Sequence, residues 1–162
     1  MKYTEYTKQR QEEFNKLPIF WAFSNKQFRE ALEKAGIKVG EGDEALQRTA
    51  RKHCYKFGMG GFYLKKDAEA IREYFKRDRN KELRDMMEKD LKFAREAIEY
   101  EMFNHEYAIN YEGDFDVVSC FGHVEYDEGK PGALYMKDLG FSEAVIKVYH
   151  DAANYVLANS DF

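Results

Sequence analysis

The sequence is poor in residues that interrupt or cross-link a chain. Its 162 residues include two prolines, two cysteines and one tryptophan. The cysteines, Cys54 and Cys120, are far apart, which excludes a disulfide-rich scaffold and a CxxC metal motif. No apolar run reaches the roughly 18 residues of a membrane span, and the N-terminus lacks a signal-peptide core. We therefore expect a cytoplasmic protein with reduced, mostly buried thiols.

Aromatic and charged residues are abundant instead. Aromatic residues make up 16% of the chain and charged residues 35%. This mixture excludes a disordered chain and is typical of a helical globule whose core is completed by aromatic rings. The length is sufficient for a substantial core. We expect a single domain over residues 1–162, or one domain to which a helix in residues 1–17 is appended.

The charges are distributed unevenly. Residues 1–96 contain 23 Lys and Arg against 17 Asp and Glu, whereas residues 97–162 contain 3 against 13. Such asymmetry is consistent with a negative face that binds a basic partner. It is equally consistent with acidic residues that only keep the C-terminal third soluble.

A long amphipathic helix is predicted over about residues 80–107. This stretch lacks proline and glycine. Its apolar positions recur at three- and four-residue steps, the spacing of one helix face. These positions are Leu83, Met87, Leu91, Ala94, Ile98, Met102 and His105. At about 1.5 Å per residue the helix is about 42 Å long, so other elements must pack along it.

Short elements precede it. Ile19–Phe23 is apolar and rich in strand-forming residues, so it predicts a buried strand. Ser24 and Gln27 form a capping box that begins a helix at Asn25. A helix capped by Asp43 follows, and the glycine-rich residues 58–61 predict a turn.

Residues 62–64 predict a second strand, which we expect to pair with 19–23. Asp67 is expected to begin another helix. The predicted fold is therefore α+β: a mostly helical domain with a long central helix and a small sheet.

The C-terminal third has weaker patterns. Residues 107–111 alternate, which fits a short strand or a frayed helix end. Asp114 is expected to cap a short helix that stops at Gly122. Residues 123–131 form an acidic loop, and a final helix carries the stripe Val145, Val148, Tyr149, Ala152 and Val156.

Three stretches resemble a family of small uncharacterised proteins of bacteriophages and gut bacteria. They are FWAFSNKQF (20–28), GMGGFYLKKD (58–67) and EMFNHEYAINYEGD (101–114). The resemblance covers about residues 20–115 and supplies no catalytic residues, and the acidic loop departs from the family pattern. It implies a phage or mobile-element setting, where small proteins often bind and block host machinery, including defence nucleases.

A basic stretch surrounds the glycine turn. Flexible backbone amides and lysine ammonium groups both favour bound phosphate, and nearby aromatic rings can stack on bases. The P-loop spacing is absent, so lysines on a solvated edge explain the same pattern. The candidate nucleic-acid-binding residues are Arg48, Arg51, Lys52, Lys56, Lys65 and Lys66.

Metal and thiol chemistry are weaker candidates. Glu101 and His105 share one helix face and are candidate metal ligands. His123 with Asp127, or His150 with Asp151, would complete the metal site of a metal-dependent hydrolase. The simpler interpretation is a buried His105 that hydrogen-bonds a carbonyl or a tyrosine hydroxyl. Lys52, His53 and Lys56 favour a lowered Cys54 pKa, but position 54 lies beside a buried stripe.

The leading hypothesis is a non-enzymatic binding protein without cofactor or metal. Through its acidic surface it inhibits a host nucleic-acid-handling complex, in the manner of an anti-CRISPR protein, since spaced carboxylates imitate phosphates. The second hypothesis is a nucleic-acid-binding accessory protein that uses the basic region 48–66. The acidic partner-binding residues are Glu99, Glu106, Glu112, Asp114, Asp116, Glu125, Asp127 and Glu128.

Overall fold

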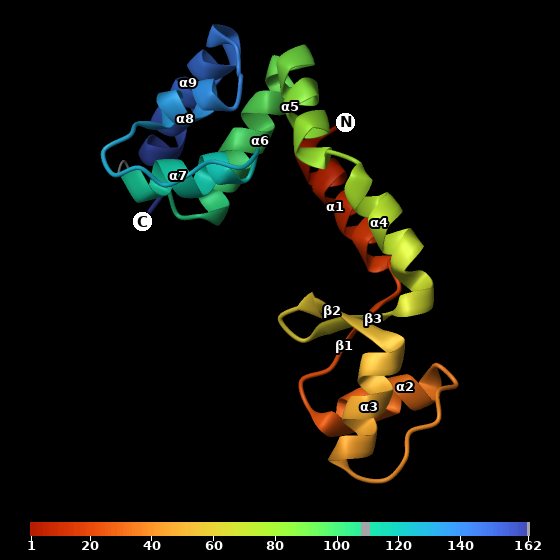
Figure 1. The fold of residues 1–162 in the computed structure, drawn as a ribbon. Helices are drawn as coiled ribbons and strands as arrows, with labels where there is room; N and C mark the ends of the chain where they lie inside the picture. The colour runs from red at the N-terminus through yellow and green to blue at the C-terminus, as the bar shows by residue number, and fades with distance from the viewer. Residues whose placement is uncertain (108–110, 162) are drawn as a thin grey trace. The chain divides into compact units, whose positions relative to one another are not determined.

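The computed structural model describes residues 1–107 and 111–161. The protein is mostly helical with a three-stranded antiparallel sheet, which confirms the α+β class (Figure 1). Contacts between residues group the chain into two units. Unit 1 comprises Met1–Arg10 with Asp78–Phe162, and unit 2 comprises Gln11–Arg77. The single domain expected from the sequence stays a prediction. None of the described helices is long and apolar enough to cross a membrane.

Unit 2 is built on the sheet. Its strands are β1 (Ile19–Trp21), β2 (Cys54–Gly58) and β3 (Gly61–Leu64), in the order β1-β3-β2. β3 pairs antiparallel with both neighbours, which confirms the predicted pairing of the stretch after residue 18 with residues 62–64. β1 is shorter than predicted and is not buried, because Trp21 and the following Phe23 are exposed. β2 was not predicted from the sequence.

Helices α2 (Asn25–Lys34) and α3 (Asp43–His53) pack on one face of the sheet. The predicted Ser24 cap is confirmed, because Ser24 Oγ accepts from the Gln27 amide at 3.2 Å. The reciprocal bond of the predicted capping box differs: Gln27 Oε1 accepts at 2.8 Å from the amide of Phe23, the residue before the cap. Asp43 is the first residue of α3 and not its cap, which is Gly42. Rings of β1, α2 and β3 form the local core, since Phe28 lies 4.6 Å from Phe62 between ring centroids.

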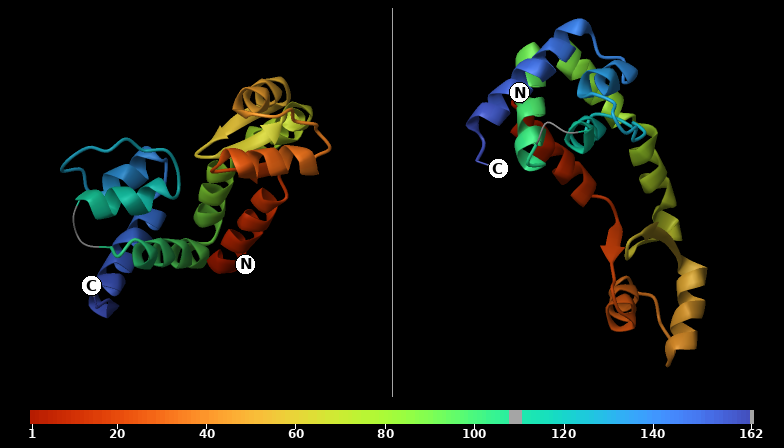
Figure 2. Two further views of the ribbon diagram at one scale, coloured as in Figure 1. Left: turned by 90° about the horizontal axis from the view of Figure 1, so that it is seen from below. Right: turned by 90° about the vertical axis from the view of Figure 1, so that its left-hand side faces the viewer.

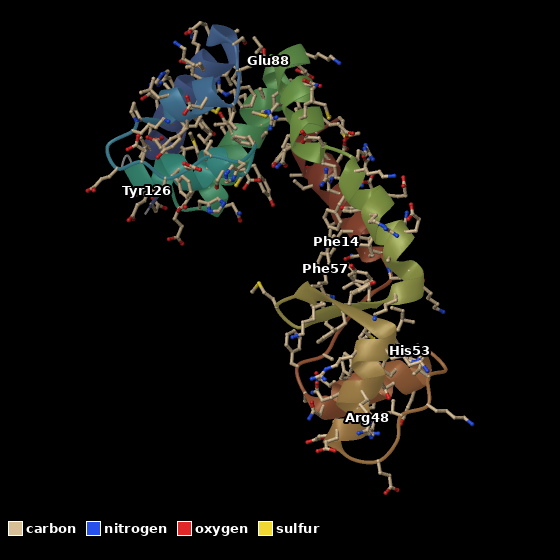
Figure 3. All side chains as sticks on the ribbon, viewed as in Figure 1. Phe14, Arg48, His53, Phe57, Glu88 and Tyr126 are labelled. Atoms are coloured by element: carbon tan, nitrogen blue, oxygen red, sulfur yellow. The ribbon has the colours of Figure 1, made fainter. Side chains whose placement is uncertain are left out.

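The other face of the sheet contacts the end of α1 (Tyr3–Asn15) and α4 (Ala68–Lys76). The Phe14 ring lies close to the Phe57 ring (Figure 3), with 6.1 Å between their centroids. The Tyr74 ring centroid lies 6.2 Å from that of Phe14. A 3-10 turn, η1 (Lys65–Asp67), leads into α4, as expected for a helix beginning near Asp67. These aromatic contacts cover part of the sheet and hold α4 against it.

The β2–β3 turn requires its glycines. Gly58 and Gly60 have φ of 100° and 86°, and Met59 between them has φ of 42°. A Cβ on Gly60 would lie 2.5 Å from the Phe23 ring. The turn therefore depends on glycine both for its backbone conformation and for the close approach of that ring.

The predicted helix over 80–107 is two helices, α5 (Arg79–Lys89) and α6 (Leu91–Asn104). Asp90 separates them in an extended conformation, and its Oδ1 accepts hydrogen bonds from the Lys92 and Phe93 amides at 3.0 and 3.1 Å. The aspartate thus begins a new helix where the apolar spacing alone predicts continuity.

Helices α7 (Tyr111–Ser119), α8 (Gly132–Asp138) and α9 (Glu143–Asn159) complete unit 1. α6 packs against α9, and the two helices cross in the core of this unit (Figure 2). Ser142 caps α9 through the Val145 amide, and the predicted stripe of α9 faces the core. The acidic loop over 123–131 is confirmed, whereas α8 was not predicted. The alternatives for residues 107–111 fall on 108–110, outside the described residues.

Asp114 does not cap a helix. It lies inside α7 and is 8% exposed. Its Oδ1 accepts hydrogen bonds from the Tyr107 hydroxyl at 2.8 Å and the Tyr149 hydroxyl at 2.5 Å. The carboxylate therefore links α7 to α9 in the interior, a role that its sequence neighbours do not indicate.

Candidate functional site

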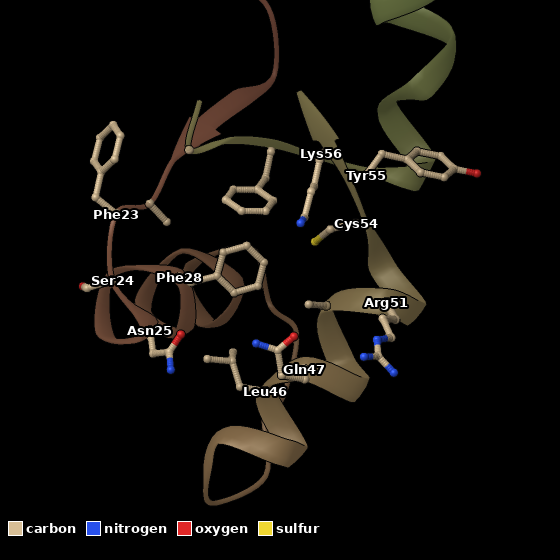
Figure 4. Close-up of a pocket in the computed structure, with 14 residues that line it drawn as sticks. Phe23, Ser24, Asn25, Phe28, Leu46, Gln47, Arg51, Cys54, Tyr55 and Lys56 are labelled. Carbon is tan, nitrogen blue, oxygen red and sulfur yellow. The ribbon is translucent and has the colours of Figure 1, made fainter. Parts of the chain in front are cut away.

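An open groove of 580 Å³ lies between α2, α3 and the sheet of unit 2. We call it the basic groove. Its floor is apolar, and the side chains of Phe28, Gln47, Cys54 and Lys56 point into it (Figure 4). Strand alternation explains this orientation, because residues 54 and 56 share one face of β2 while Tyr55 points away. The groove is lined by Ala22, Phe23, Ser24, Asn25, Phe28, Leu46, Gln47, Ala50, Arg51, Cys54, Tyr55, Lys56, Gly60 and Phe62.

A second hollow of 180 Å³ is also formed in unit 2, and it is lined by Ala35, Ile37, Lys52, His53, Leu64, Lys65 and Lys66. The end of α3 contributes to both hollows, because Arg51 lines the groove and Lys52 lines the second hollow. Lys65 Nζ donates to the Arg51 carbonyl at 2.7 Å and lies 5.1 Å from the centre of the Tyr55 ring. Neither lining contains an Asp or Glu.

The structure therefore brings together five of the six basic residues proposed from the sequence. Arg51 and Lys56 line the groove, and Lys52, Lys65 and Lys66 line the second hollow. Arg48 lines neither and forms an exposed ion pair with Glu44 on α3.

Aromatic side chains are exposed beside these cations. Phe23 at the rim of the groove is 76% exposed, and Tyr55 is 47% exposed. Unit 2 as a whole contains 14 Lys and Arg against 10 Asp and Glu, a net charge of +4, whereas the rest of the chain carries −8. Cations interleaved with exposed rings are the combination that binds single-stranded nucleic acid.

Cys54 is not an activated thiol. Burial raises its pKa, and the charge of Lys65 opposes that effect to a smaller extent. The lowered pKa considered from its basic sequence neighbours is therefore wrong, because desolvation outweighs the nearby charge.

The acidic residues proposed from the sequence divide into two groups. Asp114 is buried and belongs to the hydrogen-bonded interior, and Glu99 is paired with Arg95 at 2.6 Å on α6. Neither presents a free carboxylate to a partner. The others are exposed and have no salt bridge among the described residues: Glu106, Glu112, Asp116, Glu125, Asp127 and Glu128.

A second chemical cluster occurs in unit 1. Glu101 lies on the last turn of α6, His105 is the C-cap of that helix, and Cys120 follows the end of α7. His105 Nε2 lies 3.7 Å from Glu101 Oε2 and 3.4 Å from Cys120 Sγ. Within residues 1–107 and 111–161, this is the one group of three or more such ligand atoms that lie within reach of a shared ion.

The remaining metal-ligand expectations are not met. His123 with Asp127 and His150 with Asp151 do not join the cluster. His105 is exposed and its ring faces a thiol and a carboxylate, so the expected burial and the expected carbonyl or tyrosine partner are both wrong. Cys120 was missed as a ligand because it lies 15 residues after His105 in the sequence, beyond α7.

Burial, followed by the charge of Glu101, raises the pKa of the Cys120 thiol to about 12. The Tyr3 hydroxyl donates to Glu101 Oε1 at 2.7 Å, so a residue of α1 fixes one of the two carboxylate oxygens. Its other oxygen faces His105.

Comparison with known proteins gives a family and no activity. No curated protein and no solved structure matches the chain. Residues 2–128 match a family described as a family of unknown function (DUF7659), and this match includes all of unit 2 and the Glu101, His105 and Cys120 cluster. The chain thus belongs to the DUF7659 family.

Proposed function

We propose that this protein is a non-enzymatic binding protein that holds single-stranded nucleic acid in the basic groove and second hollow of unit 2. One observation carries the proposal: five cations and no carboxylate line the two hollows, with exposed rings at the rim. Phosphates would contact Arg51 and Lys56, and a base would stack on Phe23. The apolar floor formed by Phe28 and Leu46 would accommodate the face of a second base.

Binding is tested with fluorescently labelled single-stranded DNA and RNA oligonucleotides, measured by anisotropy at several salt concentrations. The Arg51→Gln/Lys56→Gln variant should bind at least about tenfold more weakly. Its salt dependence should also fall, by about 1.4 in the slope of log affinity against log salt, because each lost phosphate contact removes about 0.7.

A matched control removes two cations elsewhere in unit 2. Arg72 and Lys76 lie on α4, pair with Glu69 and Glu73, and line neither hollow. Arg72→Gln/Lys76→Gln should therefore bind almost as the parent does. Equal losses in the two variants, or no binding by the parent at low salt, would overturn the proposal.

Phe23→Ala tests stacking separately from charge. The ring is 76% exposed, so its removal has little effect on the core. A stacked base contributes about 1–3 kcal/mol, so affinity should fall by about 5- to 150-fold with an unchanged salt slope. An unchanged affinity would show that the ring does not contact the ligand.

A second candidate function uses the acidic residues of unit 1. Glu112, Asp116, Glu125, Asp127 and Glu128 are exposed and form no salt bridge among the described residues. This supports binding to a basic protein surface. In the cytoplasmic phage or mobile-element setting that the resemblance implies, the partner is a host nucleic-acid-handling complex, such as a CRISPR effector.

The second candidate is separated from the first by its variants. Glu125→Gln/Asp127→Asn/Glu128→Gln should weaken co-purification of the basic partner and leave oligonucleotide binding unchanged. Glu30→Gln/Glu33→Gln/Glu41→Gln in unit 2 provides the control for the loss of three negative charges. This candidate would be contradicted if the basic partner co-purified equally well at high salt and with the Glu125→Gln/Asp127→Asn/Glu128→Gln variant.

A further inference from the structure

The last turn of α6 places two different metal-ligand types on one face. Glu101 and His105 are four residues apart, so their side chains lie above one another on the helix. Cys120 approaches from the end of α7 and adds a sulfur atom. Sulfur and imidazole nitrogen together favour Zn²⁺ over Mg²⁺ or Ca²⁺, which prefer oxygen ligands.

The distances fit one ion. Ligand atoms about 2.0–2.3 Å from a tetrahedral Zn²⁺ lie about 3.3–3.6 Å from one another. The Sγ–Nε2 distance is 3.4 Å and the Oε2–Nε2 distance is 3.7 Å, and all three atoms lie within 4.8 Å. Small side-chain rotations are therefore enough to bring all three atoms to a shared ion.

The helix end fixes the position of His105. Glu106 has φ of 48°, and the Tyr107 amide donates to the Met102 carbonyl at 2.9 Å. The Glu106 amide also donates to the Phe103 carbonyl at 3.3 Å, which completes a Schellman motif. α6 consequently ends at Asn104 with His105 as its C-cap, and the ring remains next to the turn that carries Glu101.

A neighbouring side chain orients the carboxylate. Glu101 is 8% exposed, and a buried carboxylate is costly unless both oxygens have partners. Tyr3 satisfies Oε1 at 2.7 Å and leaves Oε2 directed at His105. A hydrogen bond of this kind to a ligating group is typical of metal sites.

We infer that Glu101 Oε2, His105 Nε2 and Cys120 Sγ bind a single Zn²⁺ ion, with Tyr3 as the residue that positions Glu101. Three protein ligands leave a fourth position for water or a small anion. The His105 side chain is 34% exposed, so this position opens toward solvent on the imidazole side. The competing arrangement is a thiol that only donates to the Asp116 carbonyl, 3.4 Å away.

The first test titrates the chelator-treated full chain with Co²⁺ alone. Cobalt bound to a thiolate absorbs strongly in the near ultraviolet, which reports the sulfur ligand directly. We expect one equivalent to bind with that absorption. Its absence in the parent protein, or an affinity no tighter than about millimolar, would overturn the inference.

Variants assign the ligands. Cys120→Ser should abolish the absorption and weaken binding at least about 100-fold, whereas Cys54→Ser, the matched control in unit 2, should keep both. Tyr3→Phe should retain the absorption and weaken binding by about 10- to 100-fold. Absorption that persists in Cys120→Ser, or is lost in Cys54→Ser, would contradict the assignment.

A measurement on the parent chain does not depend on any variant folding. Bound Zn²⁺ should protect Cys120 from iodoacetamide and leave the alkylation of Cys54 unchanged, as read by peptide mass spectrometry. Equal alkylation of Cys120 with and without Zn²⁺ would overturn the site. The ligands lie in unit 1, so failure here leaves nucleic-acid binding by unit 2 unaffected.

Discussion

The hydroxyl of Tyr149 donates a hydrogen bond to Asp114, 35 residues earlier in the chain, at 2.5 Å. Gly132, the first residue of α8, lies against this pair. A Cβ at position 132 would meet Tyr149 Cε1 at 2.5 Å and Asp114 Oδ1 at 2.6 Å. The buried bond between α7 and α9 thus requires a residue without a side chain at the start of α8.

Gly132→Ala should therefore destabilise unit 1 by about 1–3 kcal/mol, because the methyl group displaces the Asp114–Tyr149 pair. The sign is diagnostic, since alanine is the better helix former and would stabilise α8 in the absence of a clash. Urea unfolding followed by hydrogen exchange of unit 1 peptides measures the change. A stability equal to or above the parent value would contradict the prediction.

Unit 1 should lose stability at alkaline pH. Burial is the main cause that raises the pKa of Tyr149, and the negative charge of Asp114 raises it further. A group whose folded-state pKa is raised stabilises the fold below its ordinary pKa of about 10, and this contribution is lost as the pH rises further. Tyr149 should contribute a loss of about 1.4 kcal/mol per pH unit above that value.

The check is urea unfolding of the parent and Tyr149→Phe at pH 8, 10 and 11. The phenylalanine variant should be less stable at pH 8, and the difference between the two proteins should narrow above pH 10. Parallel pH profiles would show that the Tyr149 hydroxyl ionises as readily in the folded unit as in the unfolded chain.

Glu106→Gly should stabilise the end of α6 by about 0.5–1 kcal/mol, because glycine adopts positive φ without the steric cost that a Cβ imposes. Glu106 has φ of 48° in the Schellman motif. Glu106→Ala removes the charge but keeps the Cβ, so it controls for electrostatics and should leave stability close to the parent value. Thermal unfolding monitored by circular dichroism decides between these outcomes.

Asp90→Ala should cost about 1 kcal/mol, since two amides at the start of α6 lose their acceptor. Asp90→Asn keeps an oxygen in the same place and should be nearly neutral. Hydrogen exchange at the Lys92 and Phe93 amides measures the effect locally. Equal protection in Asp90→Ala and the parent would contradict the role of Asp90 as a cap.

Local signals in the sequence were sufficient for the elements whose causes are local. The Ser24 cap of α2 depends on neighbouring residues, and the strands β1 and β3 on local strand propensity, and all three are present. The break at Asp90 was missed because the apolar spacing continues through it without glycine or proline. One side chain that accepts two amides outweighs that periodic pattern.

Sites were harder to predict, because their residues meet only after folding. The basic residues were found together, since α3 and β2 are adjacent in the chain. Asp114 was interpreted as an exposed cap or partner ligand because Tyr149, its hydrogen-bond donor, is distant in sequence. Cys120 is likewise distant from Glu101 in the sequence, and no spacing rule connects the end of one helix to the residue that follows the next helix.

The division of the chain has a consequence for its synthesis. Residues 11–77 are grouped into unit 2 by contacts with one another, so the partners of these contacts have all been made once residue 77 has been added. Tyr3, by contrast, emerges 98 residues before the Glu101 with which it bonds. At about 5–20 residues per second, it waits about 5–20 s for that carboxylate to be made. The Tyr3–Glu101 hydrogen bond of unit 1 thus forms only after all of unit 2 has been made.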